Sequence, residues 1–177
     1  GKTAVANAAA RALRRQLIRL QCYEGLDANQ ALYEWNHARQ LLQLKQCERQ
    51  SGGADFALYG NEFLIERPLL AATRAGDSCV LLIDEIDRAD AAFEAFLLEF
   101  LADFAISIPE LGRITAPSPP LIILTSNRTR ELHEALRRRC IYCYIGYPDA
   151  EREAAIVMMR ASAVARDTAD KVVRAGT

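Results

Sequence analysis

The feature that most constrains this chain is a short apolar run, Cys79–Ile83, that ends directly in two acids, Asp84 and Glu85. A run this short and continuously apolar is typical of a strand buried on both faces of a parallel sheet. Two similar runs follow, Leu121–Thr125 and Cys140–Ile145, and helical patterns separate all three. Strands that alternate with helices predict an α/β fold with a parallel sheet.

Other elements are expected around these strands. Before Cys79 they are a helix over Thr3–Gln16, a strand over Leu17–Cys22, a helix capped by Asp27 and Gln30 that runs past Trp35 to Leu42, and a helical stretch over Asn61–Ala75 interrupted or started by Pro68. After Glu85 they are a helix capped by Asp90, a β-hairpin over Ala105–Ala116, a helix over Thr129–Arg139, and a helix from Pro148-Asp149 to about Ala165.

Composition places the chain among soluble globular proteins. Hydrophobic residues make up 51% and charged residues 25% of the 177 residues, which suits one domain, or one domain and part of a second. The net charge of −1 gives no reason to expect nucleic acid or a membrane as partner, and no apolar run approaches the roughly 20 residues of a membrane helix. The five cysteines are an odd number spread along the chain, not a disulfide framework, which points to the cytoplasm.

The two acids after Ile83 stand where α/β proteins place their functional sites, at the carboxyl end of a strand. One carboxylate there can hold Mg²⁺, and the next can orient and deprotonate an attacking water in phosphoryl transfer. We therefore expect Asp84 to bind Mg²⁺ and Glu85 to act as the general base. Capping the next helix is the alternative role, but Asp87 and Asp90 are available for it.

The chain opens on Gly1, Lys2 and Thr3, which match the last three positions of the phosphate-binding motif G-x-x-x-x-G-K-[ST]. In that motif backbone amides cradle phosphate, the lysine reaches the β- and γ-phosphates, and the hydroxyl binds Mg²⁺. A helix follows, so that its positive end faces the phosphates. Chance matches to a tripeptide are common, and the alternative is a helix N-terminus with a threonine near its cap. The motif therefore gains weight from the acids at Asp84 and Glu85.

A polar residue and an arginine run complete the candidate site. Asn127 follows the Leu121–Thr125 strand, where it can bond the γ-phosphate or the lytic water, or else serve as a turn residue. Arg137-Arg138-Arg139 end a helix, where they either complement its dipole or supply an arginine finger to a neighbouring subunit's nucleotide.

Taken together, the segments GKT, LLIDEIDRAD, LTSNRTRELHEALRRRC and YPDAEREAAI resemble the MoxR family of AAA+ ATPases. The segments RLQCYEGLDANQALYEWNHARQLL and FLIERPLL resemble its branch associated with carbon-monoxide dehydrogenase maturation, the CoxD-like branch. The resemblance spans nearly all of the chain. It implies a three-layer P-loop NTPase core and a ring-forming chaperone, expected to be hexameric, that is driven by ATP and Mg²⁺. It also implies a von Willebrand factor A-domain partner and a client metalloenzyme.

The resemblance also assigns roles to individual residues. It gives Gly1, Lys2 and Thr3 to Walker A, Asp84 and Glu85 to Walker B, and Asn127 to sensor 1. It places the arginine finger on Arg139, with Arg138 in reserve, and identifies the Ala105–Ala116 hairpin as the pre-sensor-1 insertion. The expected domains are an ATPase core over 1–147 and the start of a helical lid over 148–177.

Part of the family pattern is not present in this sequence. The resemblance places a first strand and the first Walker A glycines before Gly1, and that strand between Leu121–Thr125 and Cys140–Ile145. The chain as given is therefore expected to be inactive. Two other functions stay open: a nucleotide-binding regulatory or scaffold module without useful turnover, and a DNA-dependent AAA+ motor, which the absence of a basic–aromatic patch disfavours.

Overall fold

The computed structural model describes residues 1–49 and 58–160, and the chain divides into two compact units, Gly1–Tyr142 and a second that begins at Cys143. The elements in chain order are α1 (Lys2–Leu13), β1 (Gln16–Gln21), α2 (Ala28–Leu32), β2 (Tyr33–Trp35), α3 (His37–Arg49), η1 (Asn61–Phe63), β3 (Leu64–Glu66), α4 (Pro68–Ala75), η2 (Gly76–Ser78), β4 (Cys79–Asp84), η3 (Ile86–Arg88), α5 (Ala91–Asp103), β5 (Ala105–Ile108), β6 (Gly112–Thr115), β7 (Leu121–Leu124), α6 (Glu134–Arg138) and α7 (Ala150–Arg160).

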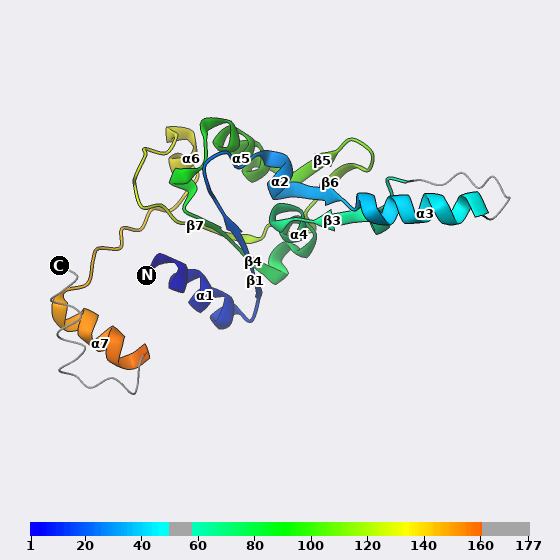
Figure 1. Ribbon diagram of the computed structural model, residues 1–177. Coiled ribbons are helices and arrows are strands. Elements are labelled where there is room, and N and C mark those ends of the chain that lie inside the picture. The colour runs from blue at the N-terminus through cyan, green and yellow to red at the C-terminus, as the bar shows by residue number, and fades with distance from the viewer. Residues whose placement is uncertain (50–57, 161–177) are drawn as a thin grey trace. The chain divides into compact units, whose positions relative to one another are not determined.

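A parallel sheet of order β1-β4-β7 forms the centre of the first unit (Figure 1). Strand β4 pairs with β1 on one side and with β7 on the other, both in parallel. All residues of β4 are buried, as the apolar run predicts. The predicted α/β fold with a parallel sheet is therefore confirmed.

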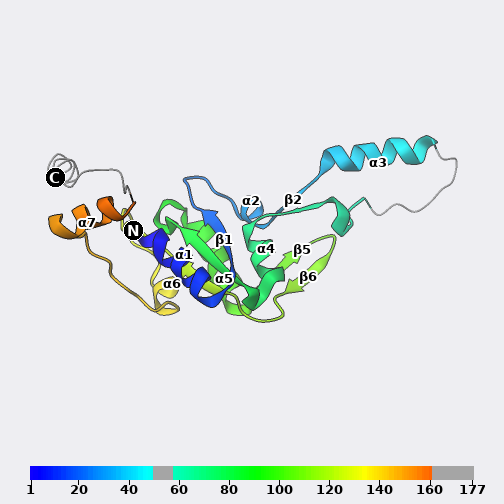
Figure 2. The ribbon, with the colours of Figure 1, turned by 90° about the horizontal axis from the view of Figure 1, so that it is seen from below.

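Helices cover both faces of this sheet, with α1 on one face and α4 and α5 on the other (Figures 1 and 2). Alternate residues of β4 point to opposite faces. Leu81 and Ile83 join a core cluster with Leu69 of α4 and Phe93 of α5. Asp90 caps α5 by accepting from the Phe93 amide at 2.8 Å, as predicted.

The predicted helix from Asp27 to Leu42 is wrong in its middle. Asp27 and Gln30 form the expected capping box, but α2 ends at Leu32, and Tyr33–Trp35 form a strand that pairs antiparallel with β3. The aromatic rings favour this strand, because Tyr33 and Trp35 lie edge to face with centroids 5.9 Å apart. The predicted helical stretch over 61–75 contains that partner strand β3, and only α4, which starts at Pro68, is an α-helix.

Two other elements follow the predictions more closely. The hairpin β5–β6 pairs Ala105 with Thr115 and turns through Gly112, whose φ of +80° suits a glycine. Helix α7 starts where Asp149 accepts from the Arg152 amide at 2.8 Å. The end predicted for this helix, near residue 165, lies outside the described residues.

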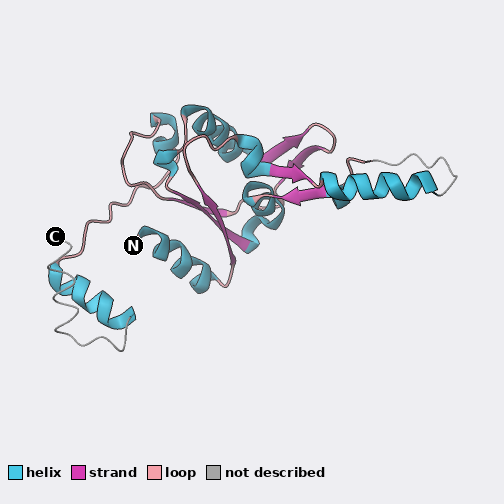
Figure 3. Ribbon diagram, in the orientation of Figure 1, coloured by secondary structure: helices cyan, strands magenta, loops and turns pink. Residues whose placement is uncertain are grey.

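The predicted strand over Cys140–Ile145 is wrong, since this segment has no regular structure (Figure 3). Within the described residues β7 pairs only with β4, and no strand pairs with Cys140–Ile145. A strand without a pairing partner has unsatisfied backbone groups, and an irregular path lets water satisfy them. Ile141 is accordingly 101% exposed. The predicted helix over 129–139 is also shorter, because only Glu134–Arg138 are helical.

No helix in the part of the chain that the structure describes is both long and apolar enough to cross a bilayer.

Candidate functional site at the carboxyl end of the sheet

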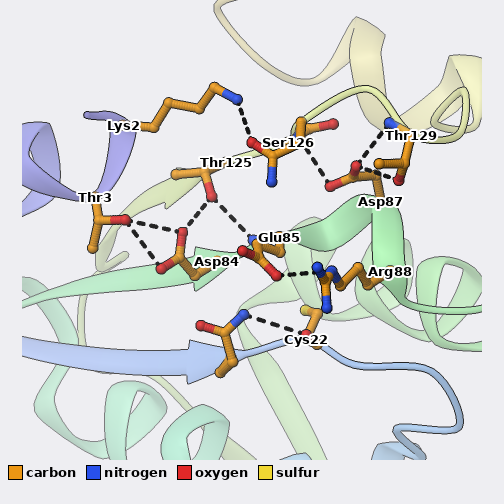
Figure 4. Close-up of polar contacts among 12 residues, drawn as sticks. Lys2, Thr3, Cys22, Asp84, Glu85, Asp87, Arg88, Thr125, Ser126 and Thr129 are labelled. Carbon is orange, nitrogen blue, oxygen red and sulfur yellow. Dashed lines mark hydrogen bonds and ion pairs between the residues drawn. The ribbon is translucent and has the colours of Figure 1, made fainter. Parts of the chain in front are cut away.

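The predicted site residues of α1, β4 and β7 meet at the carboxyl end of the sheet (Figure 4). Thr3 lies in the first turn of α1, Asp84 is the last residue of β4, and Thr125 directly follows β7. Because β4 and β7 are parallel and in register, Asp84 and Thr125 come to the same edge. The structure thus brings together groups that are 81 and 41 residues apart in sequence.

Asp84 is buried and accepts hydrogen bonds from three different elements. The Thr3 hydroxyl donates to it at 3.2 Å, the Thr125 hydroxyl donates to its other oxygen, and Arg19 of β1 pairs with it at 2.6 Å. Burial alone would raise the pKa of Asp84, but the hydrogen bonds from Thr125, Arg19 and Thr3 outweigh burial and lower it. The carboxylate is therefore held ionised, in the state that a metal ligand requires.

Glu85 leaves the strand through a sharp backbone turn. Its φ of 56° and ψ of 49° are left-handed, and no helix C-cap explains this conformation. The Glu85 amide donates to the Thr125 hydroxyl at 3.0 Å, which helps to hold the turn. Its half-buried carboxylate pairs with Arg88 at 2.9 Å. Strained backbone of this kind persists where surrounding contacts fix it, and it is common at functional sites.

Lys2 and Asn127 lie next to each other across the same edge of the sheet. The Lys2 ammonium donates to the Asn127 side-chain oxygen at 2.6 Å, although the two residues are 125 positions apart. Gly1, just before Lys2, is the N-cap of α1 and accepts from the Ala4 amide at 3.0 Å through its carbonyl. Lys2 and Thr3 thus stand beside Asn127 and Asp84, and Gly1 precedes them at the N-cap of the helix.

Two buried carboxylates fasten the segment between Asn127 and α6. Asp87 accepts from the Asn127 and Thr129 amides and from the Thr129 hydroxyl. Glu94 of α5 pairs with Arg130 and accepts from the His133 amide at 2.8 Å. Asp87 thus does not cap the helix after β4, the role that the sequence left open for it.

The arginine run lies at the end of α6, where Arg139 is the C-cap residue. Arg138 forms an ion pair with Glu134 one turn earlier, and Arg139 donates to the Ala135 carbonyl at 3.2 Å. All three arginines are exposed. Among the described residues, Arg139 makes no hydrogen bond or ion pair with Asp84, Glu85 or Asn127.

The residues at the edge of the sheet suit a magnesium–nucleotide complex better than a metal ion alone. No group of three or more His, Cys, Asp or Glu side chains in the described residues could hold a metal. Mg²⁺, however, prefers oxygen ligands and is usually held by one or two protein groups together with waters and substrate phosphates. The Thr3 hydroxyl and the ionised Asp84 carboxylate supply such oxygens side by side.

Sequence reasoning missed three of these contributors. Arg19 lies on the predicted strand of β1, but nothing local indicates that it reaches Asp84. Thr125 was assigned only to a strand, although a hydroxyl at the end of an apolar run was a usable signal. The contact between Asp87 and Thr129 depends on the adjacency of β4 and β7, which sequence spacing does not give.

The sheet is parallel, and it presents two carboxylates and an asparagine beside a helix that opens on Gly-Lys-Thr. This combination defines the class of P-loop nucleotide-binding proteins. The chain belongs to the ATPase family associated with various cellular activities (AAA), whose family model matches residues 1–146. The P-loop fold predicted from the sequence is thereby confirmed. No curated protein gives a significant sequence match to the chain.

Solved structures show the same fold at low sequence identity. A proline-to-glycine variant of RuvB from Thermotoga maritima matches 98% of this chain and 45% of its own, with 18% identity and a TM-score of 0.56. A Cytophaga hutchinsonii protein assigned as an ATPase matches 98% of this chain and 50% of its own, with 17% identity and a TM-score of 0.60. The chain thus spans about half the length of the structures that it resembles.

Proposed function

We propose that this chain carries the Mg²⁺-dependent ATP hydrolysis site of a ring-forming AAA+ remodelling ATPase of the MoxR type. The observation that supports it most is the junction at Asp84, where the Thr3 and Thr125 hydroxyls converge on one ionised carboxylate. Family membership supports nucleotide binding in general. The geometry supports a more specific division of labour among the residues.

In this proposal each residue acts on a different part of the nucleotide. Gly1 and Lys2 bind the phosphates, and Thr3 and Asp84 hold Mg²⁺, which supplies charge neutralisation at the phosphates when bound. Glu85 orients and deprotonates the attacking water. Asn127, whose side-chain oxygen already accepts from Lys2, holds the water or the γ-phosphate from the other side.

Glu85 is well placed for a base that stays unproductive until ATP is bound. Its carboxylate pairs with Arg88, which is 59% exposed, so the pair is accessible to water. A surface ion pair of this kind is weak, at about 0–1 kcal/mol, so nucleotide binding can replace it at little cost. The base can therefore be released without rearranging the strand behind it.

The finer identity rests on the segments that resemble MoxR proteins, and on the CoxD-like segments over 19–42 and 63–70. We extend the proposal on that basis to a hexameric ring, a von Willebrand factor A-domain partner and a client metalloenzyme in carbon-monoxide dehydrogenase maturation. Arg139, with Arg138 in reserve, is the finger offered to the neighbouring subunit. Residues 148–177 begin the helical lid.

The test is Glu85→Gln in the longest natural protein that contains this sequence, called the full-length protein below. Glutamine keeps the shape and removes the base, so hydrolysis falls by about 10²–10⁴ while ATP still binds. Turnover is measured by phosphate release, and binding by calorimetry with Mg²⁺-ATP.

Glu24→Gln is the matched control, because it makes the same change at an exposed position and leaves the rate unchanged. Turnover in Glu85→Gln equal to wild type removes Glu85 as the base. ATP binding without turnover in the wild-type protein itself favours the regulatory or scaffold module instead.

A further inference from the structure

Asp87 is buried with 4% of its surface exposed, yet no step of the proposed reaction uses its carboxylate. It follows Glu85 by two residues and lies in η3, the turn after β4. An ionised side chain is rarely buried unless it is paired or fully hydrogen-bonded. What Asp87 contacts therefore indicates its purpose.

Both carboxylate oxygens of Asp87 bind the loop that carries Asn127 (Figure 4). One oxygen accepts from the Asn127 amide at 3.2 Å. The other accepts from the Thr129 amide at 2.9 Å and from the Thr129 hydroxyl at 2.6 Å. The carboxylate thus holds the backbone on both sides of a single residue, Arg128.

Arg128 is where this loop bends. Its φ is 62°, in the left-handed region, and it does not sit at a helix C-cap as Arg14 and Phe104 do. A non-glycine residue in that conformation costs energy and persists only where neighbouring contacts fix it. Within the loop, the Ser126 hydroxyl accepts from the Arg128 amide at 2.9 Å. The hydrogen bonds to Asp87 enclose the bend from the neighbouring segment and add to that local contact.

Helix capping does not account for Asp87, because Asp90 caps α5. Backbone hydrogen bonds between the two segments do not extend to the bend at Arg128 in the described residues. The Ile86 amide donates to the Thr125 carbonyl at 2.9 Å, which ties the two segments only as far as Thr125. Beyond that point, among the described residues, Asp87 links the segment after β4 to the backbone amides of Asn127 and Thr129.

We propose that Asp87 is a positioning residue that fixes the Asn127 side chain by holding the left-handed bend at Arg128, and so links the segment of the catalytic base to the γ-phosphate sensor. In its kinetic part this inference rests on the proposed function. Its structural part, the hold on the loop, can be measured without any turnover.

The first experiment measures turnover and ATP affinity of full-length Asp87→Asn, alone and combined with Asn127→Ala. Asparagine keeps the size but has one acceptor oxygen, so it cannot replace all three hydrogen bonds. We expect turnover to fall about tenfold, with ATP affinity changed less than about twofold. In the Asn127→Ala background, Asp87→Asn then adds less than about twofold, because the residue that it positions is already absent.

The second experiment asks whether the bend itself is what Asp87 holds. Glycine adopts the left-handed region at little cost, so Arg128→Gly partly restores turnover in Asp87→Asn, by threefold or more. Arg128→Gly alone shows the effect of losing the arginine. If Asp87→Asn folds poorly, Thr129→Val serves in its place, with Thr129→Ser as its matched control. It removes one of the three hydrogen bonds to Asp87 and should lower turnover by a smaller factor.

Hydrogen exchange of the nucleotide-free protein supplies the independent readout. Loss of the carboxylate speeds exchange of the Asn127 and Thr129 amides, while the amides within β4 keep their protection. The proposal is overturned if Asp87→Asn lowers turnover by the same factor with and without Asn127, or if those two amides exchange as in wild type. If the wild-type protein hydrolyses no ATP, the proposed function fails, and the exchange result alone decides the role of Asp87.

Discussion

Asp84, at the end of β4, and Arg139, at the end of α6, are held in very different ways. Asp84 is 4% exposed and bonded by Thr3, Arg19 and Thr125, which come from three other segments. Arg139 is exposed and donates to a carbonyl of its own helix. A metal ligand that is already ionised and held in place binds its metal without reorganisation, whereas a group that serves a neighbouring subunit must face outward. Under the proposed function, the difference separates a metal ligand held by contacts within the chain from an arginine that faces outward, as a finger for a neighbouring subunit would.

Of the changes that test this comparison, Arg139→Ala in the assembled full-length protein should have the largest effect on turnover. A trans-acting arginine stabilises the transition state, so turnover falls by about 10³ while ATP affinity barely changes. Arg138→Ala is the control, and a smaller loss is expected because Arg138 pairs with Glu134. Phosphate release and calorimetry measure the two quantities.

Mixed rings of Arg139→Ala and Glu85→Gln subunits decide whether the arginine acts across an interface. Some interfaces in such rings pair an intact base with an intact arginine, and activity partly returns. No recovery in rings that are demonstrably mixed would mean that Arg139 acts within its own subunit or not at all.

A second prediction concerns the chain of 177 residues produced alone. Ile141 and Tyr147 are both 101% exposed, and among the described residues β7 has only β4 as a neighbour. Exposed apolar residues and an open strand edge favour association, so we expect aggregation and weak ATP binding. Size exclusion and thermal unfolding with and without Mg²⁺-ATP measure this, and the variant with serine at both exposed positions should aggregate less. A monomer whose cooperative transition rises with nucleotide would contradict the prediction.

Acid should have a smaller effect, and it acts on the stability that the buried carboxylates Asp84 and Asp87 provide. Burial alone would raise the pKa of Asp87, but hydrogen bonds from Thr129 and Asn127 outweigh burial and lower it. A carboxylate with a lowered pKa stabilises the fold above its unfolded pKa of about 3.9, and this stabilisation is lost as the pH falls through the folded pKa. Asp84 behaves in the same way. At pH values below about 4, the free energy of unfolding of the full-length protein should therefore decrease.

Asp87→Asn tests the source of that acid sensitivity. At pH 7 the variant should be less stable than wild type by about 1–3 kcal/mol, because a buried charged acceptor is lost. The gap should narrow as the pH falls and wild-type Asp87 becomes protonated. Urea unfolding at pH 7, 5 and about 3 measures it. A gap that stays constant over that range would mean that the Asp87 charge has no part in stability.

The sequence predicted what depends on short-range patterns. The apolar run before Asp84, the capping box at Asp27 and the turn at Gly112 are local, and the structure has each of them. The placement of Lys2 and Thr3 beside Asp84 also followed, since a known motif carries that long-range information. Elements that depend on a pairing partner were predicted poorly.

Tyr33–Trp35 and Cys140–Ile145 illustrate both kinds of error. The first segment has helical periodicity but forms a strand, because Leu64–Glu66 pairs with it. The second has strand composition but no regular structure, because no strand among the described residues pairs with it. In each case the decisive term is backbone pairing with distant residues, which local composition does not encode. The same limit hid the contact between Arg19 and Asp84.

The most direct test of the central claim is the Mg²⁺ dependence of nucleotide binding in three full-length proteins: wild type, Asp84→Asn and Glu85→Gln. If Asp84 holds the metal and Glu85 serves the water, added Mg²⁺ should tighten ATP binding in wild type and in Glu85→Gln. In Asp84→Asn the same addition should change ATP affinity little. Calorimetry with and without Mg²⁺ gives these values. Equal Mg²⁺ enhancement in Asp84→Asn and wild type would contradict the account, because the carboxylate on which the site converges would then not bind the metal.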